Sequence, residues 1–231
     1  MEGSVSVVMA AWNAAPFVAE ALRSVLDQTA SPAEIVVVDD GSTDDTAAIA
    51  AGFAGVTVVR QEHAGIAPAR NAGLAHARGD FLALLDADDV WLPAKLERQL
   101  AAFADDPTRE AVFSRFDEFG DIAFPPPPGT RRPLSEQGAP LPSGLVVPRR
   151  IADRIGAFAE GSNVDWIEWL ARLRALGVVE YVLPEVLFRR RIHDRNSSFL
   201  QRDDGRSLVA VAHQHRRRIR AQRDAATEVE R

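Results

Sequence analysis

Short apolar, β-branched runs alternate with amphipathic segments through residues 4–104, and this alternation leaves few folds open to the chain. Runs this apolar are typical of strands that are buried on both faces. A helix between successive strands makes them parallel, because a parallel pair needs a crossover connection. Strands are expected at 4–10, 35–38, 56–59 and 80–85, and helices at 16–29, 43–51, 66–77 and 93–104. We therefore predict an α/β fold with a mostly parallel central sheet and helices on both faces.

The second half of the chain has a less regular pattern. Strands are expected at 111–116, 144–147, 178–183 and 186–190, and helices at 165–176 and 207–225. Residues 124–142 include the run Pro125–Pro128 and are predicted to form a long loop, of the kind that serves as a lid or a binding loop. We predict a single domain over residues 1–204, followed by a helix or tail over 205–231.

Composition disfavours several classes of protein. The 27 Lys and Arg residues against 33 Asp and Glu give a net charge of −6, which disfavours a general nucleic-acid binder. The absence of cysteine excludes disulfides, thiol catalysis and cysteine-bound metals. No run of about 18 apolar residues occurs and no basic segment precedes the first apolar stretch, so we expect neither a membrane-spanning helix nor a signal peptide, and a cytoplasmic location. Lys95 is the single lysine among the basic residues, which we interpret as a coding bias toward arginine.

Polar clusters follow three of the predicted strands, at residues 10–13, 39–42 and 86–89. Open α/β sheets bind their ligands beyond the carboxyl ends of the strands. The aspartates of the last two clusters make this edge negative, and Mg²⁺ or Mn²⁺ shared with substrate phosphates is the simplest partner for them. Each cluster alone is also compatible with an ordinary turn or helix cap. Both together, each directly after an apolar strand, favour a binding site.

Four motifs, in this order, resemble those of the family 2 glycosyltransferases: Val5–Asn13 (VSVVMAAWN), Ile35–Thr43 (IVVVDDGST), Ala69–Gly73 (ARNAG) and Leu84–Asp89 (LLDADD). That family has a GT-A fold, whose α/β domain transfers a sugar from a nucleotide diphosphate. The resemblance is tight over residues 4–100 and looser over 144–198. It implies a nucleotide-sugar-binding half in residues 1–104 and an acceptor and catalytic half in 105–204, with the 124–142 loop on the acceptor side.

The resemblance implies specific roles in donor binding. Ala10 and Trp12 would line the base pocket, with the indole stacked on the base. Asp39 would accept a hydrogen bond from the base, which for uracil is its N3–H, because a carboxylate accepts and does not donate. Asp86 would contact the ribose or the water shell of the metal, and Asp88 would bind Mn²⁺ or Mg²⁺ directly.

Further roles follow from two other segments of the same resemblance. Arg70 would lie against the diphosphate or the donor sugar. The closing segment Arg189–Ser197 (RRRIHDRNS) would turn Arg191 and His193 toward the diphosphate, with His193 a further metal ligand through its neutral imidazole. Asp89 would cap the next segment or support its neighbours.

The resemblance places the general base in the segment Gly161–Leu170 (GSNVDWIEWL). Family members carry Glu-Asp there, and the aspartate takes the proton of the acceptor hydroxyl. Asp165 matches this aspartate, whereas Val164 stands where the glutamate is usual. Glu168, one helical turn further on, is the alternative base. Asp165 is also suited to be the N-cap of the helix that follows.

We therefore expect a metal-dependent, inverting glycosyltransferase. Its donor would be a nucleotide sugar, and we favour a UDP-sugar. Inversion is expected from the resemblance alone. The acceptor stays open among saccharides, carrier lipids, peptides and small molecules, and the basic run Arg216–Arg220 is compatible with peripheral membrane contact.

A non-catalytic nucleotide-sugar-binding protein of the same fold is the alternative. A phosphoryl-transfer protein matches less well, because the phosphatase motif would follow the first strand. No G-x-G-x-x-G follows the first strand, which disfavours a dehydrogenase.

Overall fold

The computed structural model describes residues 3–120, 140–162, 164–193 and 196. The strands are β1 Val5–Ala11, β2 Glu34–Asp40, β3 Val56–Gln61, β4 Phe81–Asp86, β5 Val90–Trp91, β6 Ala111–Gly120, β7 Leu145–Pro148 and β8 Glu180–Ile192. The helices are α1 Val18–Leu26, α2 Thr46–Ala51, α3 Ile66–His76, α4 Lys95–Asp105, α5 Arg149–Ile155 and α6 Asp165–Ala175, with a 3-10 turn, η1, at Pro142–Gly144. None of these helices is long and apolar enough to cross a membrane. The expected helix 207–225 and most of the expected loop 124–142 lie outside the described residues.

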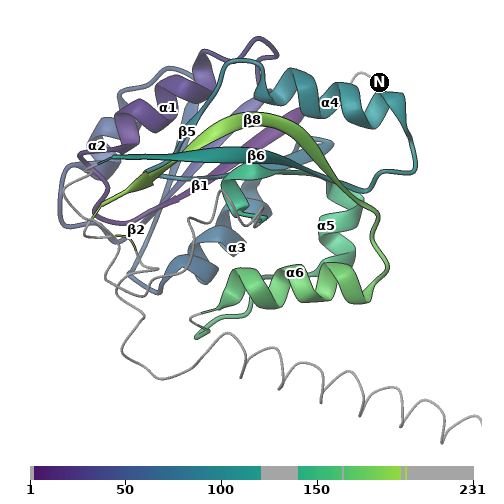
Figure 1. The fold of residues 1–231 in the computed structure, drawn as a ribbon. Helices are drawn as coiled ribbons and strands as arrows, with labels where there is room; N and C mark the ends of the chain where they lie inside the picture. Colours follow the sequence, from purple (N-terminus) through teal and green to yellow (C-terminus); the bar gives the residue numbers. More distant parts are fainter. Residues whose placement is uncertain (1–2, 121–139, 163, 194–195, 197–231) are drawn as a thin grey trace, which may run out of the picture. The chain divides into compact units, whose positions relative to one another are not determined.

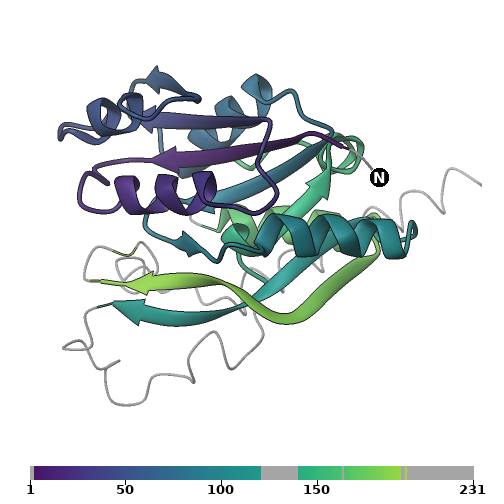
Figure 2. The same cartoon turned by 90° about the horizontal axis from the view of Figure 1, so that it is seen from above.

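The strands form one sheet in the order β3-β2-β1-β4-β7-β6-β8-β5. Strands β3, β2, β1 and β4 are mutually parallel, which confirms the predicted α/β arrangement of the first half. Among the described residues, each antiparallel pair includes a strand of the second half: β7 lies between β4 and β6, and β8 pairs with β5. Figure 2 shows β6 and β8 side by side, and these two strands are parallel.

Helices cover both faces of the sheet, as Figure 1 shows: α1 and α4 lie on one face, and α3, α5 and α6 on the other. Successive residues of β1 alternate between the two cores. Val7 and Met9 pack with the buried residues of α1 and α4. Val8 packs with those of α3, α5 and α6. Strands that are buried on both sides must be apolar throughout, and this is the physical cause of the continuous apolar runs in the sequence.

Helix α3 approaches the sheet closely at Gly73. A Cβ atom at this position would collide with Cγ1 of Val8 and would lie 3.3 Å from Cγ2 of Val38. Only glycine therefore lets α3 rest directly on β1 and β2. The close approach fixes the distance of Arg70 from the sheet, because Arg70 lies one turn before Gly73 on the same helix.

Several elements differ from the sequence expectation, and four of them are instructive. Residues 180–192 form the single strand β8, whereas two strands were expected at 178–183 and 186–190. Pro184, the apparent break, lies within β8 at a shift in its register against β6, and such an irregularity accommodates a residue that has no N–H to donate. Helix α1 covers only Val18–Leu26 of the expected 16–29. The short elements α5 and β5 were not predicted, because neither is long enough to show a period.

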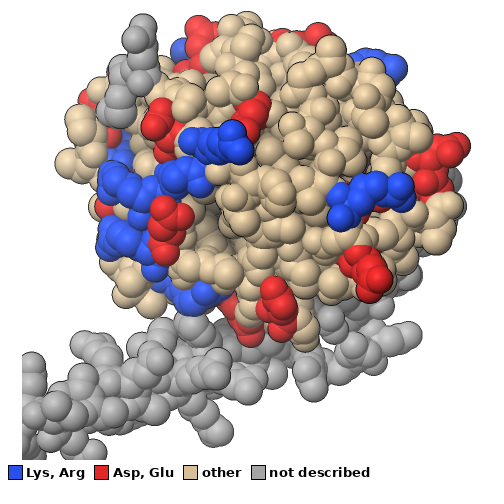
Figure 3. Space-filling view, turned by 180° about the vertical axis from the view of Figure 1, so that it is seen from behind, with Lys and Arg blue, Asp and Glu red and all other residues tan. Residues whose placement is uncertain are grey.

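Arginine side chains on the described surface lie among acidic ones. Arg150 and Arg154 both face Glu110, with N–O distances of 3.6 and 3.4 Å, and Arg98 pairs with Glu185 at 2.6 Å. Figure 3 shows this mixture of basic and acidic groups on one face. Exposed pairs of this kind stabilise a fold by about 0–1 kcal/mol each. The arginine bias is thus mainly a property of the solvated surface.

Candidate active site

The polar clusters meet at the carboxyl edge of the parallel strands. Ala11 at the end of β1 is level with Asp39 in β2, and Ala10 is level with Asp86 in β4. The end of β8 reaches the same edge, where Nε2 of His193 lies 3.0 Å from Oδ2 of Asp88. The structure therefore brings together side chains from β1, β2, β4 and the far end of the described chain.

Asp39 is a buried carboxylate whose hydrogen bonds are incomplete. Its exposed fraction is 0%, and Nε of Arg60 donates to its Oδ2 at 3.2 Å. Its Oδ1 is buried and has no hydrogen-bond partner among the described residues. Leaving a charged acceptor unpaired away from water costs more than about 1–3 kcal/mol, so such an atom calls for an explanation. An N–H group of a ligand would supply the missing donor.

Trp12 presents an exposed aromatic face near this carboxylate. Its side chain is 53% exposed, and the indole stacks on the imidazole of His63 with ring centroids 4.5 Å apart. Nδ1 of His63 lies 2.9 Å from Oδ2 of Asp40. The same carboxylate accepts the backbone N–H of Ala64 at Oδ1 and that of Gly65 at Oδ2. The stacked pair is thus held in place by Asp40, and the exposed part of the indole can contact a planar ligand group.

Asp89 supports the neighbouring acidic residues from inside the fold. It is 4% exposed and accepts hydrogen bonds from Oγ of Ser143 at 2.6 Å and from the backbone N–H of Arg191 at 3.0 Å. Burial, and then the nearby carboxylates of Asp88 and Asp86, raise the pKa of Asp89 well above its ordinary value. These bonds connect η1 and the end of β8 to the 86–89 segment.

Asp88 and His193 are the two side chains that suit a divalent cation. They are partly exposed, at 26% and 13%, and supply a carboxylate oxygen and an imidazole nitrogen 3.0 Å apart. Both are donor types that Mn²⁺ accepts. No group of three or more metal-ligating side chains occurs within the described ranges. The residues therefore fit a cation that takes its remaining ligands from substrate oxygens and water.

Arg191 lies beside this pair of residues. Its Nε donates to the backbone carbonyl of Asp88 at 3.0 Å, and its Nη2 donates to a carboxylate oxygen of Glu20. The guanidinium also lies over the rings of Phe17 and Phe119, at 5.3 and 4.4 Å from their centroids. These contacts place a positive charge next to the Asp88 segment, at the edge where the sequence analysis expects the diphosphate.

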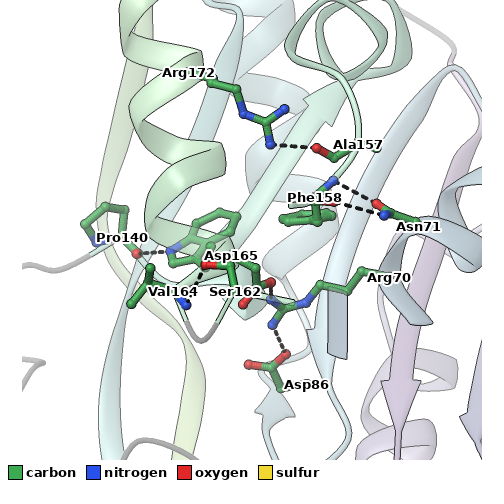
Figure 4. Close-up of polar contacts among 11 residues, drawn as sticks. Arg70, Asn71, Asp86, Pro140, Ala157, Phe158, Ser162, Val164, Asp165 and Arg172 are labelled. Carbon is green, nitrogen blue, oxygen red and sulfur yellow. Dashed lines mark hydrogen bonds and ion pairs between the residues drawn. The ribbon is translucent and has the colours of Figure 1, made fainter. Parts of the chain in front are cut away.

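Asp165 and Arg70 form a buried ion pair, shown in Figure 4. Nη1 of Arg70 donates to Oδ2 of Asp165 at 2.7 Å, and Nη2 donates to Oδ1 of Asp86 at 2.8 Å. Asp165 is the first residue of α6, whose N-cap is Val164, so the interpretation of Asp165 as the N-cap is wrong. Its carboxylate is directed to Arg70 instead. The alternative base, Glu168, is half-buried on the same helix.

Among the contributors to the site that the sequence did not indicate are His63, Ser143 and Phe158, whose ring lies 5.4 Å from the guanidinium of Arg70. Each acts through a partner far along the chain, as with Ser143, which is 54 residues from Asp89. No local spacing marks such residues, because only the folded chain brings the partners together. The same holds for the pairing of Arg70 with Asp165, 95 residues away.

Comparison with known sequences assigns the chain to a family. Residues 6–156 match the model of glycosyl transferase family 2. The putative teichuronic acid biosynthesis glycosyltransferase TuaG of Bacillus subtilis is 40% identical over 101 residues, which are 42% of this chain and 40% of TuaG. The Escherichia coli protein WfgD, named as a UDP-Glc:alpha-D-GlcNAc-diphosphoundecaprenol beta-1,3-glucosyltransferase, is 39% identical over 100 residues, 42% of this chain and 40% of WfgD. The chain thus spans about two fifths of the length of these curated relatives.

Solved structures share the fold over most of the described chain. The mannosyltransferase PcManGT of Pyrobaculum calidifontis, in complex with GDP-Man and Mn²⁺, has a TM-score of 0.69 at 25% identity and covers 87% of this chain and 60% of its own. TarS of S. aureus, in complex with UDP, has a TM-score of 0.66 at 22% identity and covers 82% and 60%. Both comparisons confirm the predicted GT-A fold. Since the family model also covers more than half of the sequence, the chain belongs to glycosyltransferase family 2.

Proposed function

We propose that the protein transfers a sugar from a UDP-sugar to an acceptor nucleophile, with the help of a divalent cation and with inversion at the anomeric carbon. The observation that carries the proposal is the buried Oδ1 of Asp39, which has no hydrogen-bond partner among the described residues, at the same edge of the sheet as the exposed Trp12. Together they offer an acceptor for a ring N–H and a surface on which a base can stack.

Uracil suits this pair of features. Its N3–H would donate to Oδ1 of Asp39, and its ring would stack on Trp12, a contact worth about 1–3 kcal/mol for a base on an aromatic side chain. The names of two similar proteins support a uridine donor: TarS has been solved with UDP-GlcNAc, and WfgD is named for UDP-Glc. PcManGT was solved with GDP-Man, so guanine is the competing base in the test below.

The leaving group is a nucleoside diphosphate, whose charge must be neutralised as the glycosidic bond breaks. Asp88 and His193 would hold Mn²⁺ or Mg²⁺, which supplies that neutralisation when bound. The guanidinium of Arg191 lies next to Asp88 and adds positive charge at the same place. Arginine pairs well with phosphate oxygens because its donors lie in one plane.

Asp165 would act as the general base. Its carboxylate takes the proton of the acceptor hydroxyl while the acceptor oxygen forms a bond to the anomeric carbon. The bond from that carbon to the diphosphate oxygen breaks in the same step, and the electron pair leaves with UDP. A single displacement of this kind inverts the configuration. The name of WfgD, which includes a diphosphoundecaprenol, favours a lipid-linked saccharide as the acceptor.

Donor binding is tested by calorimetric titration of UDP and GDP in the presence of Mn²⁺. We expect wild-type protein to prefer UDP and the variant Asp39→Asn to bind UDP at least tenfold more weakly, a loss of about 1.4 kcal/mol. Asp45→Asn is the matched control, because Asp45 is exposed and its side chain makes no capping hydrogen bond. A preference for GDP, or unchanged UDP binding by Asp39→Asn, would refute the uridine assignment.

Turnover separates the enzyme from the alternative of a non-catalytic nucleotide-sugar-binding protein. We expect Mn²⁺-dependent release of UDP from at least one UDP-sugar when saccharide and lipid-linked acceptors are supplied. UDP binding without release from any donor would support the non-catalytic alternative instead.

A further inference from the structure

Arg70 is a buried cation that joins two carboxylates from distant parts of the chain. Only 5% of the residue is exposed. One terminal nitrogen donates to Asp165 in α6 and the other to Asp86 at the end of β4, at 2.7 and 2.8 Å. Figure 4 shows the guanidinium between the two carboxylates. The planar group therefore fixes the separation of a donor-side carboxylate and the proposed base.

The position of the guanidinium is itself fixed from α3. It lies over the ring of Phe158, 5.4 Å from the centroid. The next residue along α3, Asn71, holds the backbone of Phe158 on both sides: it accepts the N–H at 2.7 Å and donates to the carbonyl at 3.0 Å. Consecutive residues of one helix thus supply both the cation and the anchor of the ring beneath it. Such support is what a site needs to hold reacting groups in register.

The charges favour this arrangement over contact with a substrate. Burial by itself would lower the pKa of Arg70, but the carboxylates of Asp86 and Asp165 hold it above its ordinary value, so the side chain stays charged. Turning the guanidinium toward a diphosphate would leave a buried carboxylate without its partner, which is strongly destabilising. Arg191 is less buried than Arg70 and already lies beside Asp88.

We propose that Arg70 is a positioning residue, which sets the carboxylate of Asp165 relative to Asp86 and does not bind the donor diphosphate. The proposal rests on the proposed function for the role of Asp165. It departs from the sequence expectation, which placed Arg70 against the diphosphate or the donor sugar. It follows that Arg70 makes no direct contact with the donor, so a variant that still pairs with Asp86 should keep its donor affinity, whereas the rate of transfer depends on the bridge to Asp165.

The test uses the variant Arg70→Lys, which keeps the charge but cannot bridge two carboxylates with a planar group. Arg98→Lys, at an exposed ion pair, is the matched control. The Kd of UDP is measured by calorimetry, and kcat and the donor KM are measured from UDP release. We expect Arg70→Lys to keep Kd and KM within twofold and to lower kcat at least tenfold, while Arg98→Lys behaves as wild type. Combined with Asp165→Asn, Arg70→Lys should add no further loss of kcat, because it acts through Asp165.

The results that would overturn this proposal differ from those that would overturn the proposed function. A tenfold rise in the Kd of UDP for Arg70→Lys, or an unchanged kcat, would overturn the positioning role in a protein that still transfers sugar. Failure of the wild type to bind UDP or release it would overturn the proposed function, and the positioning role with it. If Arg70→Lys does not fold, a crystal structure of the wild type with UDP tests whether Arg70 contacts Asp165 or the diphosphate. Arg70 should still contact Asp165 there, and a bond from Arg70 to a phosphate oxygen would contradict the proposal.

Discussion

Asp39 and Asp165 are both buried carboxylates of the candidate site, but their partners differ. Asp165 faces the full positive charge of Arg70, whereas Asp39 has a partner at Oδ2 and none among the described residues at Oδ1. Environment rather than residue type divides the roles of such carboxylates. An atom that lacks a partner suits ligand binding, and a carboxylate held in a fixed direction suits proton transfer.

Asp165→Asn should separate these roles. The amide oxygen can still accept from Arg70, so the fold and the donor site should persist, but the amide cannot take a proton at neutral pH. We expect transfer to fall at least a hundredfold, since general bases contribute about 10²–10⁴-fold, with UDP binding unchanged. Rates of UDP release measure the effect. Glu168→Gln is the control and should transfer normally; the reverse pattern would assign the base to Glu168.

At the scale of single elements, the contact between α3 and β1 positions Arg70. Gly73→Ala tests this contact. Alanine favours a helix by about 1 kcal/mol over glycine, but its Cβ would collide with Val8, and overpacking costs about 1–3 kcal/mol. We expect a net loss in the free energy of unfolding, measured with urea, and a lower kcat as α3 moves. Val8→Ala should partly restore the stability of the variant, because it removes the Cγ1 atom with which the new Cβ would collide. A Gly73→Ala protein as stable as wild type would contradict the close packing.

The elements also show what the sequence can predict. The parallel strands are readable because burial on both faces requires continuous apolar runs, and their polar ends are readable because parallel strands end at one edge. Pro184 misleads because a proline normally ends a strand, and only the paired strand β6 reveals the irregularity that admits it. The link from Arg70 to Asp165 depends on packing between α3 and α6, which no local pattern encodes.

At the scale of the whole molecule, Lys95 departs from the pattern of surface charges. The single lysine of the chain has 0% exposure, donates to Oε1 of Gln99 at 2.7 Å and lies 4.0 Å from the centroid of Trp91. Gln99 in turn donates to the carbonyls of Val112 and Gly144 at 2.8 Å each. This buried network connects α4 with β6 and η1, and η1 carries the serine that supports Asp89.

Burial lowers the pKa of Lys95 well below its ordinary value of 10.5. Between the lowered value and 10.5 the unfolded chain binds the proton and the folded chain does not, so the free energy of unfolding rises with pH in this window. The rise is at most about 1.4 kcal/mol per pH unit for one proton. Urea denaturation of wild type and Lys95→Met between pH 7 and 10.5 measures this contribution of Lys95. The titrations of the other groups cancel when the two free energies of unfolding are subtracted. We expect wild type to gain stability relative to Lys95→Met as the pH rises. A difference that does not change with pH would mean that Lys95 stays protonated in the folded core, held by the ring of Trp91.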